Sequence, residues 1–131
     1  HFGYRRQRQM CIRDRHYRQL SVRRLMMMMR RVLERQMQWM VFEPNTPSLW
    51  ADVRHLLTTW LRQLFAQGAF RGATPEEAFF VKCDAELNTQ RQIDAGRLHC
   101  EVGVAPAEPI EFIVLKLTAG ADGTEIREVA A

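Results

Sequence analysis

The sequence predicts an α+β domain of two layers, in which amphipathic helices cover a sheet of about four mixed or antiparallel strands and an extended C-terminal arm follows. One long segment, residues 47–67, repeats its apolar residues at helical spacing, and residues 98–105 alternate with the period of a strand. The chain has 131 residues, 47% hydrophobic and 26% charged, which is ordinary for one globular domain.

The first half of the chain predicts two helices separated by a strand. Apolar residues recur at steps of three and four from near Tyr17 to Met37, which predicts an amphipathic helix. The short aromatic segment Trp39–Phe42 is expected to form a buried strand that ends before Pro44. The second helix has Thr46 as N-cap and Pro47 in its first turn, and it is expected to close at a left-handed Gly68.

The second half of the chain predicts three more strands with short helical turns between them. Helical turns are expected at Thr74–Glu77, where a cap and acidic residues coincide, and between Asn88 and Gly96. Strands are expected at Phe79–Cys83, at Leu98–Ala105 with its alternating pattern, and at Ile110–Leu117.

The last thirteen residues are expected to form a flexible arm rather than part of the compact domain. Ala119–Gly123 has the composition of a hinge, and Thr124–Val129 is strand-like. Its two large apolar residues, Ile126 and Val129, differ in parity and would face opposite sides of a strand. Such an arm is either disordered, which the composition slightly favours, or added to an existing sheet edge.

The basic character of the chain lies in its first fifteen residues. The formal net charge is +4, and residues 1–15 hold five arginines and one aspartate, whereas the remainder carries equal numbers of basic and acidic residues. Gln9–Arg15 also resembles the translation of a transposase adaptor used in sequencing libraries. Residues 1–15 are therefore expected to be an adaptor artefact or a disordered leader. The alternative function is a small basic module whose Arg-rich N-terminus binds nucleic acid.

The cysteines do not predict a metal centre or a disulfide framework. Cys11 lies in the leader, and Cys83 and Cys100 lack the spacing of a zinc ribbon. Cys100 falls on the inward positions of its strand and His99 on the outward ones, so two unpaired thiols are expected. The alternative, a metal or thiol enzyme, requires Cys83 and Cys100 within ligand distance and an activity that depends on both.

Motifs of enzymes and of membrane proteins are not found. The sequence lacks GxSxG, Walker, GxGxxG and HExxH strings, so no enzyme, cofactor or metal is expected. The longest apolar run, Leu25–Met29, is far shorter than the roughly 20 residues that cross a bilayer, so no membrane anchor is expected.

Several short strings occur along the chain in an informative order. They are Ser21–Leu25 (SVRRL), Gln38–Asn45 (QWMVFEPN), Ala78–Asp84 (AFFVKCD), Ile93–Leu98 (IDAGRL) and Val102–Pro106 (VGVAP). The series, across about residues 17–118, resembles the C-terminal region of contractile tail sheath proteins from myophage-type tails, prophages and related injection systems. Met26–Met29 and the two arginines that follow depart from the family's usual apolar and then acidic helix.

The resemblance implies a structural subunit and no catalysis. Residues 16–118 would be the C-terminal domain of a larger sheath protein, and residues 119–131 its flexible arm. The implied partners are neighbouring sheath subunits and a tail tube, with no nucleic acid and no membrane. The implied action is helical assembly around the tube, then contraction that drives the tube through the target envelope. The implied location is the virion tail, assembled in the bacterial cytoplasm.

Two candidate interfaces follow from the resemblance. Arg23 and Arg24 would pair with acidic residues of the tube, although two surface arginines also fit a solvated helix flank. Thr124, Ile126 and Val129 would lie at the subunit interface, because terminal arms in the family add strands to the sheets of neighbouring subunits.

Overall fold

The computed structural model describes residues 22–107 and 111–130. The expected leader at residues 1–15, the start of the first helix near Tyr17, and Ile110 of the last predicted strand lie outside these residues. The elements, in chain order, are α2 (Val22–Met40), α3 (Pro47–Ala66), α4 (Pro75–Ala78), β1 (Phe79–Lys82), α5 (Gln90–Asp94), β2 (Leu98–Val104), β3 (Ile113–Gly120) and β4 (Gly123–Ala130).

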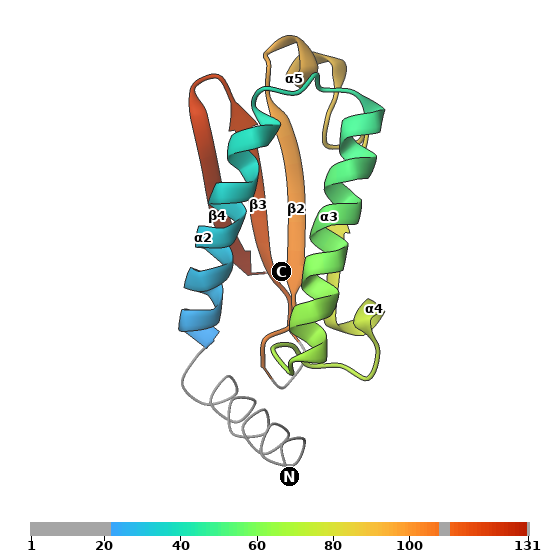
Figure 1. The fold of residues 1–131 in the computed structure, drawn as a ribbon, viewed down its shortest axis with the longest axis vertical. Coiled ribbons are helices and arrows are strands. Elements are labelled where there is room, and N and C mark those ends of the chain that lie inside the picture. The colour runs from blue at the N-terminus through green and yellow to red at the C-terminus, as the bar shows by residue number, and fades with distance from the viewer. Residues whose placement is uncertain (1–21, 108–110, 131) are drawn as a thin grey trace.

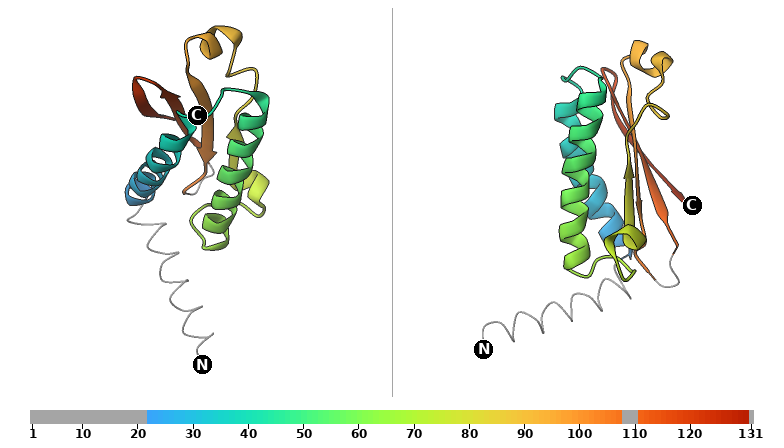
Figure 2. Two further views of the ribbon diagram at one scale, coloured as in Figure 1. Left: turned by 45° about the horizontal axis from the view of Figure 1, so that its top comes forward. Right: turned by 90° about the vertical axis from the view of Figure 1, so that its right-hand side faces the viewer.

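The fold has two layers, as predicted (Figure 1). The four strands pair in the order β1-β2-β3-β4, and every pair is antiparallel. Both long helices lie on the same face of this sheet, which the right-hand view of Figure 2 shows edge-on. Helix α2 packs over β3 and β4, whereas α3 packs over β1. The other face, called the helix-free face below, carries no long helix among the described elements; the short α5 lies only at its end, where Gln92 meets the His99 side chain.

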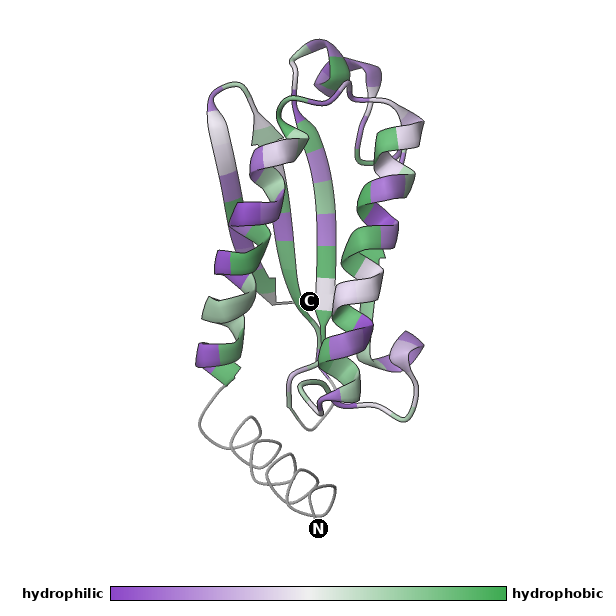
Figure 3. Cartoon of the chain, viewed as in Figure 1, coloured by the Kyte–Doolittle hydropathy of each residue, from purple (hydrophilic) through white to green (hydrophobic). Residues whose placement is uncertain are grey.

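The core lies between the helices and the sheet. Hydrophobic and hydrophilic residues alternate around both long helices, as Figure 3 shows, and the hydrophobic stripe of each helix is buried. Strand β2 buries alternate residues over its first half, which confirms the predicted period of two. The side chains that are almost fully excluded from water include Leu25, Met29, Leu33, Met37, Val53, Leu57, Leu61, Val102, Val104 and Leu115.

The start and end of α3 follow local sequence chemistry. The Thr46 hydroxyl accepts a hydrogen bond from the Leu49 backbone N–H at 3.4 Å, and Pro47 occupies the first turn, where no N–H is needed. After the helix, Gly68 adopts φ 84°, the left-handed conformation that closes a helix end. These three predictions are confirmed.

The predicted strand at Trp39–Phe42 is wrong. Helix α2 continues to Met40, and residues 41–42 form a turn in which the Phe42 side chain is 87% exposed. Leu33, Met37 and Met40 follow one another at helical spacing and all face the core, so burial of this stripe overrides the strand preference of the aromatic residues.

The predicted hinge and disorder at the C-terminal end are also contradicted. Strand β3 runs on to Gly120, a two-residue turn follows, and β4 pairs with β3 along its whole length. Gly123 has φ 120°, which lets the chain reverse so sharply, and Ile126 is buried against the core. The arm therefore has a place in the domain's own sheet, because backbone pairing needs no apolar side chains.

Candidate functional site

The exposed side of α2 carries a basic stripe. Arg24, Arg31 and Arg35 are exposed and recur at steps of seven and four, so they lie on one side of the helix. Met27, which is 49% exposed, lies among them, and the group borders a shallow depression of about 450 Å³. Among the described residues no ion pair joins these arginines to a carboxylate, since the one ion pair there is Lys82–Glu86.

The structure separates the two arginines predicted to contact a tube. Arg24 belongs to this basic stripe, whereas Arg23 borders a different depression, of about 490 Å³, between α2 and β4. Glu128 of β4 lines that second depression, and nearby Arg30 donates a hydrogen bond to the Ile126 carbonyl. Sequence reasoning missed Arg31 and Arg35, although their helical spacing from Arg24 was available to find them.

The three predicted residues of β4 do not share one surface. Ile126 is 6% exposed and lies opposite Leu117 in the core layer. Val129 lies opposite Val114 and has the other parity, so it faces away from the helices, as the sequence predicted. Thr124 is exposed next to the turn. All three residues belong to β4, which is an edge strand of the described sheet and pairs there with β3 on one side only.

The helix-free face of the sheet is polar along its middle and aromatic at one end. Lys82, Glu101, Lys116 and Arg127 lie side by side across the four strands. At the aromatic end, the Phe80 ring lies directly over Gly103, where an added Cβ would come within 2.0 Å of it. Phe80 also makes an edge contact with the Phe112 ring, with centroids 5.5 Å apart. A polar sheet face of this kind suits contact with solvent or with a hydrated partner surface.

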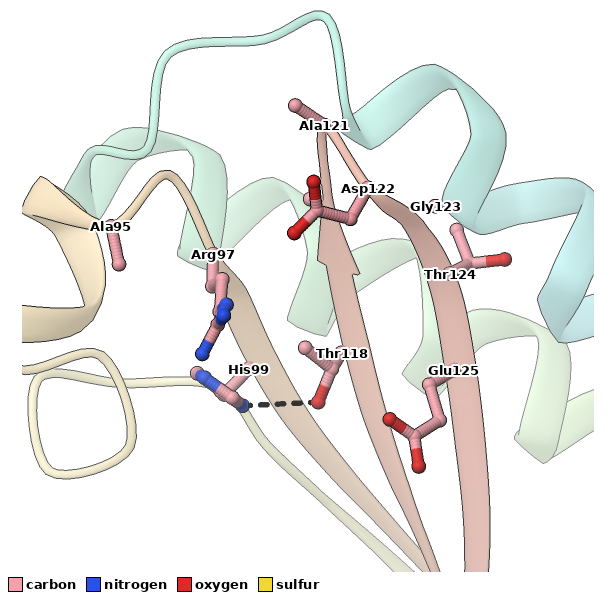
Figure 4. Close-up of a pocket in the computed structure, with 10 residues that line it drawn as sticks. Ala95, Arg97, His99, Thr118, Ala121, Asp122, Gly123, Thr124 and Glu125 are labelled. Carbon is pink, nitrogen blue, oxygen red and sulfur yellow. Dashed lines mark hydrogen bonds between the residues drawn. The ribbon is translucent and has the colours of Figure 1, made fainter.

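A pocket of about 540 Å³ lies beside the β3–β4 turn (Figure 4). His99 and Thr118 point toward one another across it, with the Thr118 hydroxyl 3.2 Å from the His99 Nδ1, and the Gln92 side-chain oxygen is 2.9 Å from the other ring nitrogen. Burial, and then the nearby charge of Arg97, lowers the pKa of His99, which favours a neutral imidazole. Asp122 and Glu125 make the remaining wall acidic, so the pocket has mixed charge and no clear ligand.

The structure brings Cys83 and Cys100 together. Their sulfur atoms are 3.0 Å apart, which meets the distance condition of the thiol or metal enzyme alternative. His99 is engaged with Thr118 and Gln92 instead of these sulfurs. Within the part of the chain that is described, no group of three or more potential ligands gathers to hold a metal ion. None of the helices described there is long and apolar enough to span a membrane.

Comparisons with known proteins agree with the arrangement of helices and sheet. Among solved structures, the anti-feeding prophage (AFP) baseplate contains a chain that matches with a TM-score of 0.62 and 37% identity, over 67% of this chain and 25% of that chain. The contracted PVC sheath complex of an extracellular contractile injection system matches with a TM-score of 0.56 and 38% identity, over 60% and 23%.

This chain therefore spans about a quarter of the length of each matched chain. Among curated protein sequences, none matches it. The family model described as the phage tail sheath C-terminal domain matches residues 13–119, which is most of the chain. The resemblance found in the sequence strings is thereby confirmed, and the chain belongs to the phage tail sheath C-terminal domain family.

Proposed function

We propose that this domain is a structural part of a contractile sheath, which polymerises around a tail tube and contracts to drive the tube through a target envelope. The observation that carries the proposal is family membership over residues 13–119, together with 38% identity to a chain of a sheath complex. On this proposal the domain performs no catalysis and needs no cofactor. Its place is a virion or injection-system tail that is assembled in the bacterial cytoplasm.

The proposed tube contact is the basic stripe of α2, formed by Arg24, Arg31 and Arg35 around Met27. The stripe suits an acidic surface because its arginines lack carboxylate partners among the described residues, and exposed Met27 supplies an apolar centre. Arg23 would contribute less, since it lies beside Glu128.

The proposed contact between subunits is strand exchange through β4. In the isolated domain β4 already pairs with its own β3, so donation to a neighbour means that one β4 replaces another identical one. Such a swap keeps the same strand contacts and changes only the turn at residues 121–122, which makes it a low-cost route to assembly. Head-to-tail exchange of this kind is open-ended, as a helical sheath requires.

The sheath function is tested with a chimera in which this domain replaces the matched region of the PVC sheath chain, produced together with its tube protein. Sheathed tubes seen by electron microscopy are expected for the chimera and not for Arg24→Glu/Arg31→Glu. Arg62→Glu, at an exposed position of α3, is the matched control, and this variant should assemble normally. Normal assembly of the double variant would rule out the tube contact, and failure of the parent chimera would count against the sheath function itself.

Strand exchange is tested by locking the β3–β4 hairpin. Thr118 and Glu125 are directly opposed on the helix-free face, so Thr118→Cys/Glu125→Cys allows a cross-strand disulfide there. If β4 must leave its own sheet, the oxidised chimera should stay monomeric and the reduced chimera should polymerise. Equal polymerisation in both states would refute the exchange and favour pairing at the open edge of β4.

A further inference from the structure

Two buried thiols face each other between β1 and β2. Lys82, the last residue of β1, lies opposite Glu101, and continuing that register by one residue places Cys83 opposite Cys100. Cys83 is fully buried and Cys100 is 3% exposed. The Cys100 thiol donates to the Cys83 sulfur at 3.0 Å, about 1 Å more than the roughly 2.04 Å of a disulfide bond.

Contacts from two other segments hold this pair in place. The buried Asn88 side-chain amide donates to the His99 carbonyl at 2.9 Å and lies 3.9 Å from the Cys83 sulfur. Its oxygen accepts from the His99 N–H at 2.8 Å, so Asn88 bonds to both the N–H and the C=O of the residue next to Cys100. From the helix layer, the Arg54 guanidinium donates to the Cys83 carbonyl. The pairing of the sulfurs is thus fixed by surrounding hydrogen bonds.

We propose that Cys83 and Cys100 are a modification site, which a peroxide oxidises to an intrachain disulfide. Directly opposed residues of antiparallel strands have Cα atoms about 4.5–5.5 Å apart, which lies inside the roughly 4.4–6.8 Å range of disulfides. Closure therefore requires small side-chain rotations and no rearrangement of the sheet. The proposal does not depend on the sheath function.

The oxidation balances with hydrogen peroxide as the oxidant. The Cys83 sulfur attacks one peroxide oxygen, the O–O bond breaks, and the products are a Cys83 sulfenic acid and, after proton transfer, one water. The Cys100 sulfur then attacks the Cys83 sulfur, the S–O bond breaks, and the thiol proton leaves with the hydroxide as a second water. Two thiols and one peroxide thus yield one disulfide and two waters.

The environment shifts the pKa values of the two thiols in opposite directions, as the order of these two reaction steps requires. The hydrogen bond from Cys100, with smaller contributions from the Arg54 charge and the Asn88 amide, lowers the pKa of Cys83 against the opposing effect of burial. The same hydrogen bond, together with burial, raises the pKa of Cys100. A cavity of about 230 Å³ has Cys100, and not Cys83, among its lining residues, so hydrogen peroxide has to pass Cys100 to reach the Cys83 sulfur.

The disulfide would close a loop from Cys83 to Cys100 that contains α5. A cross-link over a loop of this length restricts the unfolded chain and is expected to raise the melting temperature by about 10 °C. The modification would therefore stiffen the end of the sheet beside the β3–β4 turn without involving β4.

The test uses the 131-residue chain with Cys11→Ser, so that Cys83 and Cys100 are the two thiols present. The folded protein is treated with hydrogen peroxide, unfolded in urea, and its free thiols are counted by alkylation. Loss of both thiols together, recovery of tryptic peptides 83–91 and 98–116 as one linked species, and reversal by dithiothreitol are expected. Oxidation of methionines does not change this count, so it does not confuse the result.

The controls separate the disulfide from simple thiol oxidation. In Cys11→Ser/Cys100→Ser, Cys83 should stop at a sulfenic acid that dimedone traps, and Cys100→Ala serves if the serine variant fails to fold. Persistence of both thiols at peroxide concentrations that oxidise exposed Met27 would overturn the proposal. So would cross-links found only between separate chains, or a melting temperature that does not rise on oxidation.

Discussion

Replacing Asn88 with alanine should destabilise this domain more than its small change in volume suggests. Strand β1 ends at Lys82, so the N–H and C=O of His99 have no strand partner on that side. The Asn88 side chain supplies both partners, accepting at 2.8 Å and donating at 2.9 Å, and it also donates to the Asp84 carbonyl at 3.1 Å. With 2% of its surface exposed, Asn88 acts as a one-residue continuation of the strand.

The magnitude follows from the two backbone groups of His99 that lose the Asn88 side chain. The N–H is left without a partner, and the carbonyl keeps only the weak donor of the Cys83 thiol at 3.6 Å. Each such group costs about 1–2 kcal/mol when water is excluded, so the free energy of unfolding should fall by about 2–4 kcal/mol. For a domain of this size, that loss corresponds to a melting temperature about 8–16 °C lower.

Urea unfolding, followed by the fluorescence of the three tryptophans, measures this change as a lower midpoint at unchanged slope. Asn45→Ala is the matched control. Asn45 also makes two side-chain hydrogen bonds, to the Arg97 carbonyl at 2.9 Å and from the Trp50 indole at 2.6 Å. Because Asn45 is more exposed, water can replace them, and we expect a loss of about 1 kcal/mol or less. An Asn88→Ala loss no larger than that of Asn45→Ala would refute the reasoning.

Other changes have equally definite outcomes. Leu61→Ala, at a fully buried position of α3, should lower the free energy of unfolding by about 2–5 kcal/mol in the same urea assay, and a loss below 1 kcal/mol would contradict the core assignment. In Gly103→Ala the added methyl group should collide with the Phe80 ring and force it away. Once Phe80→Ala removes the ring, adding Gly103→Ala should therefore cause no further loss in the free energy of unfolding. A further loss would mean that the methyl group collides with something other than Phe80. The lowered pKa of His99 means that the unfolded chain binds its proton more readily, so the His99 contribution is complete above the ordinary pKa of 6.5 and stability falls as the pH drops below it. His99→Gln should flatten that part of the pH profile, and an unchanged profile would assign the dependence to another group. Deleting residues 120–131 should leave the chimera unable to polymerise, and polymerisation without them would end the role of β4.

Several predictions that rest on local chemistry were confirmed, although the side chain of the predicted cap Thr74 makes no capping hydrogen bond. The cap at Thr46 and the left-handed Gly68 depend on residues close in sequence, and both are present. The alternation in β2 also identified its buried side correctly, because a strand that packs on one face must separate apolar from polar residues. The ordered strings pointed to the family, which the match over residues 13–119 then established.

Predictions that depend on competition between distant segments failed. Trp39–Phe42 has the composition of a strand, but the stripe that ends at Met40 is stabilised by the sheet beneath α2, so the helix continues. The spacing of Arg24, Arg31 and Arg35 was visible in the sequence, yet their shared exposure depends on which side of α2 faces the sheet.

By itself, the sequence determined the helices, the alternating strand and the family, because caps, turns and periodicity act over a few residues. The tertiary structure alone decided that β4 completes the sheet. Among the side chains of β4 that are described, Ile126 alone is buried, so the strand is held mainly by backbone pairing to β3. The tertiary structure also decided that Cys83 and Cys100 touch, because a contact between residues far apart in the chain is set by strand register, which spacing in the sequence does not specify.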